Sequence, residues 1–129
     1  MIPLLDRALE GVKGLGPFVS VNSPIDGTDN YDFMMQGVPN LVANQESANY
    51  GPNYHARSDE FGRADLRQLR LNGAVAAAVT WSFANAETAV ARQTAQQVDS
   101  LVRGTDLADQ MRSFGVWDAW VAGKRGRRP

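Results

Sequence analysis

The chain has no cysteine and a single histidine among its 129 residues. The lack of cysteine excludes disulfides and thiolate metal sites, so any bound zinc would need imidazole and carboxylate ligands. Charged residues make up 21% of the chain and nearly cancel to a net charge of −1, which gives no long-range field toward nucleic acid. No apolar run approaches the roughly 20 residues that span a bilayer. The composition therefore predicts a chain that binds no nucleic acid and has no membrane span.

The N-terminal half alternates helical and strand-like patterns. Apolar residues at three- and four-residue spacing after Pro3 predict a helix that Gly14 ends. Apolar runs at 18–21 and 38–43 predict two short strands. A short helix is expected between the strands. Thr28 or Asp29 would cap this helix, and Gly37 would end it. Its apolar members are Tyr31, Phe33, Met34 and Met35.

The C-terminal half begins with a long polar loop. Residues 44–64 are rich in Asn, Gly, Pro, Ser and Tyr, and a loop of this length is better explained by function than by connection. A capping-box pattern at Asp65 predicts the start of an Ala-rich helix that runs to Ala86. Further helices are expected over 87–102 and after a cap at Thr105.

The order of these elements predicts a layered α/β fold. Two short strands do not make a sheet that helices can cover on both faces, because buried strands need neighbours for their backbone groups. We therefore expect the chain to form part of a larger domain.

His55 is the first candidate for a functional residue. It lies on a polar loop after a strand-like run, where α/β proteins place metal ligands and catalytic groups. The acidic residues that could add oxygen ligands are Asp26, Asp29, Asp32, Glu46, Asp59 and Glu60. From the residues alone, two interpretations stay open: a metal-binding or catalytic histidine, and a polar loop residue that hydrogen-bonds to backbone.

The stretch from 27 to 85 also carries several motifs at fixed spacing. These are Gly27–Asp29, Phe33, Gly37–Pro39, Leu41–Val42, Gln45–Glu46, Tyr50, Tyr54–His55 and Asp59, followed by the Ala-rich helix. In order and spacing they resemble the C-terminal part of the M28 family of zinc-dependent exopeptidases, in particular its plasma glutamate carboxypeptidase-like branch.

The resemblance implies a fold and an activity. The fold would be the C-terminal portion of a three-layer α/β/α zinc-exopeptidase domain, with an incomplete sheet. The activity would be hydrolysis of a terminal peptide bond of a peptide or dipeptide by metal-activated water. His55 would be the last ligand of a site that holds two zinc ions in the full-length parent.

The resemblance also implies roles for four neighbours of this site. Asp29 would orient a ligand or the substrate, Asp59 would hold the turn behind His55, and Tyr50 and Tyr54 would line the substrate cleft. Each has a plainer alternative that the residues leave open: an N-cap for Asp29, turn formation for Asp59, and loop packing for the two tyrosines.

The chain departs from the family pattern in ways that predict a fragment. Ala56 stands where the family usually has Thr, and the chain has no second histidine and no Glu-Glu pair. Catalytic zinc normally has three protein ligands plus water, so one histidine does not hold it. We expect Met1 to be an internal residue or a misassigned start, with the general base and the other ligands upstream. The isolated chain would then be inactive, its parent would be exported, and a dimer stays open.

These expectations divide the chain into three parts. Residues 1–86 would belong to the peptidase domain, 87–122 would form a helical extension whose Trp117 and Trp120 cover a hydrophobic surface, and 123–129 would be a basic disordered tail. Two other functions are alternatives to the peptidase. One is a non-catalytic interaction domain of the same fold, as in transferrin-receptor-like proteins. Such a domain does not require an imidazole at this position, so the presence of the His55 loop argues against it. The other is a glutaminyl-cyclase-like acyltransferase, whose relatives favour Trp where this chain has Tyr54.

Overall fold

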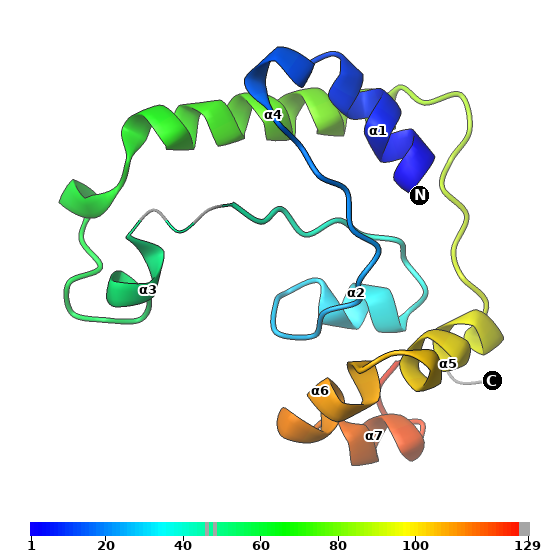
Figure 1. The fold of residues 1–129 in the computed structure, drawn as a ribbon. Helices are drawn as coiled ribbons and strands as arrows, with labels where there is room; N and C mark the ends of the chain where they lie inside the picture. The colour runs from blue at the N-terminus through cyan, green and yellow to red at the C-terminus, as the bar shows by residue number, and fades with distance from the viewer. Residues whose placement is uncertain (46, 48, 127–129) are drawn as a thin grey trace. The chain divides into compact units, whose positions relative to one another are not determined.

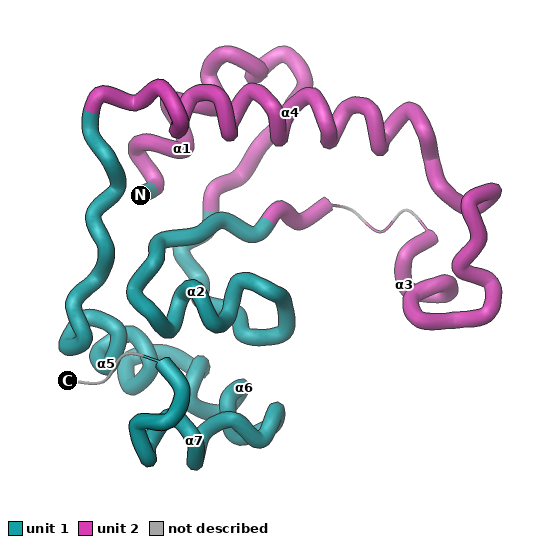
Figure 2. Tube along the Cα trace, turned by 180° about the vertical axis from the view of Figure 1, so that it is seen from behind, with its two compact units in different colours: residues 1, 21–42, 88–129 teal, residues 2–20, 43–87 magenta. Residues whose placement is uncertain are grey.

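The structure is a computed structural model that describes residues 1–45, 47 and 49–126 (Figure 1). All regular secondary structure in these residues is helical. The predicted α/β fold, and with it the three-layer α/β/α arrangement, is therefore wrong. The chain divides into two compact units (Figure 2). Unit 1 comprises Met1, 21–42 and 88–129, and unit 2 comprises 2–20 and 43–87.

The two predicted strands, at 18–21 and 38–43, have no regular secondary structure and join no sheet within the described residues. Val19 and Val21 expose 85% and 74% of their surfaces, and Leu41 and Val42 are exposed as well. Apolar and β-branched residues favour strands, but a strand forms only where another strand supplies the hydrogen bonds of the ladder. Both strand predictions are therefore wrong.

Unit 1 contains helices α2 (Tyr31–Met35), α5 (Ala95–Gly104), α6 (Leu107–Ser113) and α7 (Trp117–Val121). Apolar residues at helical spacing direct one face of each helix into a shared core. The buried members of this core are Tyr31, Met34, Met35, Val98, Val102, Leu107, Met111 and Trp120.

Capping residues set where the unit 1 helices begin. A complete capping box starts α5: Thr94 Oγ1 accepts the Gln97 N–H at 3.2 Å, and Gln97 Oε1 accepts the Thr94 N–H at 2.8 Å. The helix that was predicted to begin at residue 87 therefore begins eight positions later, at Ala95. The short α2 helix was predicted correctly and ends before Gly37 at φ 76°, but its N-cap is Asn30 rather than Thr28 or Asp29.

Unit 2 contains α1 (Ile2–Glu10), the 3₁₀ turn η1 (Lys13–Leu15), α3 (Tyr50–Asn53), the 3₁₀ turn η2 (Phe61–Arg63) and α4 (Leu66–Ala84). Helix α1 packs against α4, and both long helices were predicted. Asp65 Oδ1 caps α4 by accepting the N–H groups of Arg67 and Gln68 at 2.9 and 3.0 Å. No residue of α4 is buried.

Candidate functional site

The loop that carries His55 is a series of tight turns in unit 2. The Tyr54 N–H donates to the Tyr50 carbonyl at 2.7 Å, and the Ala56 N–H donates to the Asn53 carbonyl at 3.0 Å. These bonds place His55 at φ 52°, in the left-handed region that few non-glycine residues adopt. The side chain of His55 is exposed. The backbone turns thus present an imidazole to solvent.

Three aromatic rings stack in a row on this loop. The Tyr50 and Tyr54 ring centroids are 4.8 Å apart with an interplanar angle of 28°, and those of Tyr54 and His55 are 4.0 Å apart at 19°. Desolvation raises the pKa of Tyr50, and the adjacent Tyr54 and the negative charge of Asp59 raise it further. Stacking on Tyr54 engages one face of the imidazole. Neither ring nitrogen makes a hydrogen bond within the described residues, so both remain available at the ring edge.

Hydrogen bonds fix both sides of the His55 turn. The Asp59 N–H donates to the Ala56 carbonyl at 3.0 Å, and Ser58 Oγ donates to the Pro52 carbonyl at 3.5 Å. At the start of the loop, Asn72 Nδ2 on α4 donates to Gln45 Oε1. Asp59 thus takes part in the turn behind His55 through its backbone, and its side chain is exposed.

The described residues do not form a complete metal centre. No group of three or more histidine, cysteine, aspartate or glutamate residues in that part of the chain could hold a metal ion. Glu46, part of the predicted Gln45–Glu46 motif, lies outside the described residues. A catalytic zinc needs three protein ligands, and this loop supplies one imidazole. No catalytic step through zinc follows from these residues alone.

The predicted site residues are divided between the two units. Tyr50, Tyr54, His55 and Asp59 share one loop of unit 2, whereas Asp29 belongs to unit 1. Asp29 is exposed, immediately before the N-cap of α2.

A second candidate site lies within unit 1, and the sequence analysis did not predict it. A pocket of about 260 Å³ is lined by Asp29 together with Asp26, Tyr31 and Arg125. Asp26 and Tyr31 are 8% and 5% exposed. Both carboxylate oxygens of Asp26 and the hydroxyl of Tyr31 are buried without a hydrogen-bond partner in the described part of the chain. Desolvation raises the pKa of Asp26, while the residue's own backbone N–H dipole opposes the shift and the negative charge of Asp106 adds to it.

An ion pair forms part of the same pocket. Arg125 Nε and Nη2 donate to the two carboxylate oxygens of Asp32 at 2.7 and 2.9 Å, and the guanidinium lies 5.1 Å from the centroid of the Tyr31 ring. The Arg125 hydrogen bond lowers the pKa of Asp32. Only the presence of several aspartates between 26 and 32 signalled this site in the sequence, because Arg125 lies far along the chain.

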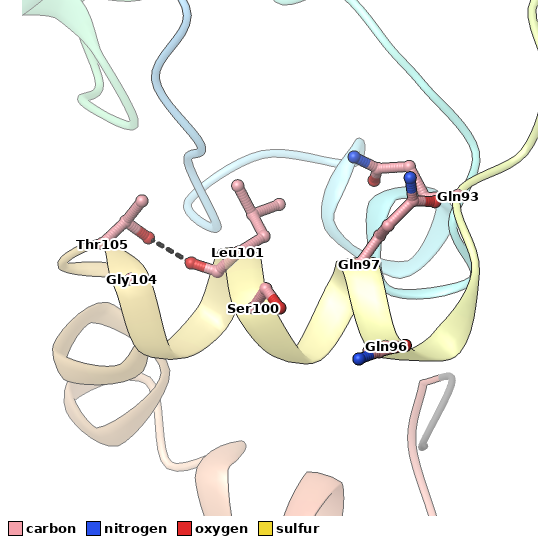
Figure 3. A pocket seen from close by; sticks show the side chains of 7 residues that line it. All are labelled: Gln93, Gln96, Gln97, Ser100, Leu101, Gly104 and Thr105. Carbon is pink, nitrogen blue, oxygen red and sulfur yellow. Dashed lines mark hydrogen bonds between the residues drawn. The ribbon is translucent and has the colours of Figure 1, made fainter.

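A more open groove of about 580 Å³ runs along α5 (Figure 3). Its lining is largely amide and aliphatic, and includes Gln93, Gln97 and Leu101. Thr105 Oγ1 donates to the Leu101 carbonyl at 2.7 Å, so this hydroxyl already has a partner. The lining of the groove contains no charged side chain, and its hydroxyl groups belong to Ser100 and Thr105.

Comparison of the chain with protein-family models, curated proteins and solved structures finds no match. Among the described residues, no helix is both long enough and apolar enough to cross a bilayer.

Proposed function

We propose that this chain contributes an imidazole ligand, His55, to a zinc-dependent exopeptidase that hydrolyses terminal peptide bonds. The observation that carries the proposal is the exposed His55 ring, held by backbone turns and an aromatic stack with both nitrogens available. The resemblance to M28 exopeptidases supplies the class of reaction. His55 can serve as a ligand without a sheet in this chain, because local backbone turns hold it.

The remaining ligands would come from outside the described residues, either from other parts of the protein or from a second chain. Tyr50 and Tyr54 would form one wall beside the metal, and Asp59 would hold the turn through its backbone bond to Ala56. Asp29 stays a proposed substrate-orienting residue. The substrate would be a peptide or dipeptide. The isolated chain would be inactive, because one imidazole does not bind zinc at useful affinity.

The test is a zinc titration of the 129-residue chain followed by NMR. The chain has one histidine, so its ring signals need no assignment. We expect zinc to shift the His55 ring signals with a dissociation constant weaker than about 100 µM, since a single neutral imidazole is an incomplete site. His55→Ala should abolish the interaction, and the chain should not hydrolyse dipeptides.

One control variant accompanies this test. Asp118→Asn removes one negative charge from a residue outside the His55 loop. It should leave zinc binding unchanged, because Asp118 belongs to unit 1 and His55 to unit 2. Zinc that leaves the His55 ring unshifted at millimolar concentration would contradict the proposal. Dipeptide hydrolysis that survives His55→Ala would also contradict it.

A further inference from the structure

Two exposed tyrosines lie face to face on one loop of unit 2. The ring centroids of Tyr50 and Tyr54 are 4.8 Å apart, and the ring planes differ by 28°. The two residues are 60% and 54% exposed. Desolvation raises the pKa of Tyr50, and the neighbouring Tyr54 hydroxyl adds to the rise, so the polar ends of the rings are also close together. The loop thus holds two solvent-accessible phenols side by side.

Local backbone structure holds this pair of rings together. The Tyr54 N–H donates to the Tyr50 carbonyl at 2.7 Å and closes a single helical turn between the two residues. Within that turn, Asn53 Nδ2 donates to the Asn49 carbonyl at 2.6 Å. The Tyr54 ring also stacks on His55, with centroids 4.0 Å apart. The separation of the two phenols is therefore set by the turn itself.

Neighbouring phenols have a characteristic oxidation chemistry. A phenol that loses one electron and one proton becomes a neutral radical, with unpaired electron density at the carbons ortho to its oxygen. Two such radicals couple by forming a bond between one ortho carbon of each ring. The hydrogens on these two carbons then move to the oxygens, which restores both phenols. The product is dityrosine, which has lost two hydrogen atoms, and the oxidant has taken up two electrons while two protons enter the solvent.

The turn favours coupling within one chain over coupling between chains. Two groups joined by a short stretch of chain have an effective concentration in the millimolar range or above, far beyond that of a dilute protein. The rings must turn from a stacked to an edge-joined arrangement, and exposed side chains have the rotational freedom to do so. The third tyrosine, Tyr31, is 5% exposed in the core of unit 1 and is poorly accessible to an oxidant.

We propose that Tyr50 and Tyr54 are an oxidative crosslinking site, at which a one-electron oxidant joins the two rings as dityrosine. The oxidant belongs to the class of photogenerated metal complexes and peroxidase intermediates, which take one electron at a time. The new bond closes the turn covalently and fixes the ring on which His55 stacks. The reaction uses neither zinc nor the imidazole, so it does not rest on the proposed function.

Brief illumination of the 129-residue chain with tris(bipyridine)ruthenium(II) and persulfate is the test. Light and persulfate generate ruthenium(III), the one-electron oxidant, and persulfate is the final acceptor of the electrons. We expect dityrosine fluorescence from a product that stays monomeric on a denaturing gel. Mass spectrometry should show the loss of two hydrogen atoms, located by fragmentation between Tyr50 and Tyr54. The fraction of chain that is linked should not change between about 10 and 1 µM protein, because the coupling is intramolecular.

Matched tyrosine variants identify the two partners. Tyr50→Phe keeps the ring and removes the phenol, so it should abolish the link. Tyr31→Phe makes the same change at the buried tyrosine of unit 1 and should alter the yield by less than about twofold. The chain has three tyrosines, so these two variants and Tyr54→Phe cover every possible pair.

A further variant separates the geometry of the turn from mere closeness in sequence. Tyr54→Phe combined with Ala56→Tyr keeps three tyrosines and places the moved one at another exposed position of the loop. It removes the stacked pair, so the yield of linked chain should fall at least about fivefold. Concentrated urea should lower the yield of the unchanged chain in the same way, because the turn is lost on unfolding.

Several results would overturn the proposal. One is a product that forms only as a covalent dimer, and another is oxidation at the exposed Trp81 with no link between tyrosines. A third is a yield that is equal in urea and in buffer, because the folded turn would then contribute nothing. His55→Ala leaves both phenols in place and should still be linked, whereas it should abolish the zinc interaction. The two proposals can therefore fail separately.

Discussion

Unit 1 and unit 2 differ in how their helices are stabilised. Unit 1 encloses a core in which Trp120, Leu107 and Met111 are nearly or fully buried. In unit 2, the longer α4 helix buries no residue, and the one buried apolar side chain described there is Ala8 on α1. Burial stabilises the unit 1 helices, whereas alanine content and the Asp65 cap stabilise α4. Helix length is thus no guide to which unit is more stable.

The same contrast separates the two candidate sites. The pocket of unit 1 has a buried carboxylate beside a packed core, and its geometry is fixed by tertiary contacts. The His55 loop of unit 2 is exposed and depends on local turns and ring stacking. In a site of the first kind, packing within one unit positions the side chains. A site of the second kind needs ligands from elsewhere to become a metal centre.

The largest expected effect comes from a matched pair of tryptophan substitutions. Trp120 is 2% exposed in unit 1, and Trp81 is 71% exposed on α4. Trp120→Ala should lower the free energy of unfolding by about 3–5 kcal/mol through loss of buried contacts and creation of a cavity. Trp81→Ala should change it by less than about 0.5 kcal/mol. Urea unfolding monitored by circular dichroism measures both, and equal losses would remove the contrast between the units.

The second effect is a pH dependence specific to unit 1. The folded-state pKa of Asp26 is raised above its ordinary value of 3.8, so folding favours the protonated carboxyl. This contribution to stability is fully present below pH 3.8 and is lost as the pH rises through the raised pKa. Asp26→Asn should therefore stabilise the chain at pH 7 by about 1 kcal/mol and lose that advantage toward pH 3.5. A pH-independent difference in thermal unfolding would refute the assignment.

A third pair of variants compares the helix caps. Thr94→Ala removes the capping box of α5, and Asp65→Ala removes the acceptor at the start of α4. Each should cost about 1 kcal/mol, since both leave N–H groups of the first turn without a side-chain acceptor. Chemical unfolding should register the Thr94 loss globally, because α5 carries core residues. The Asp65 loss should appear as faster amide exchange confined to α4, and an equal effect of both on global unfolding would argue against independent units.

The smallest expected effect concerns the ion pair at the pocket. Asp32 and Arg125 are both substantially exposed, so a double-mutant cycle with Asp32→Asn and Arg125→Met should give a coupling below about 0.5–1 kcal/mol. Because the pKa of Asp32 is lowered, this contribution is present above its unfolded pKa and lost as the pH falls through the folded value. Salt should weaken it further. A coupling of several kcal/mol would mean that the pair is a structural part of the core.

The helices could be predicted from this sequence, but contacts between segments distant in the chain could not. The spacing of apolar residues in α1 and the cap at Asp65 depend on neighbours a few positions away, so both helices were predicted close to their observed places. Strands at 18–21 and 38–43 depend on partners distant in sequence, which a pattern of apolar residues does not supply. The boundary of α5 was missed because the apolar spacing was extended back across 87–93, although Thr94 and Gln97 carried the signal.

Site prediction followed the same division between local and distant contacts. The sequence predicted His55 on a polar loop, and the structure shows it exposed there. Its stacking on Tyr54 was not predicted, although the two residues are adjacent in the chain. The pocket of unit 1 joins Asp26 and Tyr31 to Arg125 from the far end of the sequence. Tyr31 was predicted only as an apolar member of α2. Its unpartnered hydroxyl became visible only with the packing of the core.

Hydrogen exchange of the 129-residue chain tests the difference between the units most directly. Amides of α5 and α6 should exchange by global unfolding and show the highest protection, because their side chains form the core. Amides of α4 should exchange by local opening at much lower free energy, despite the greater length of the helix. Protection of α4 equal to that of α5 would contradict the account, because it would mean that unit 2 is stabilised by burial as strongly as unit 1.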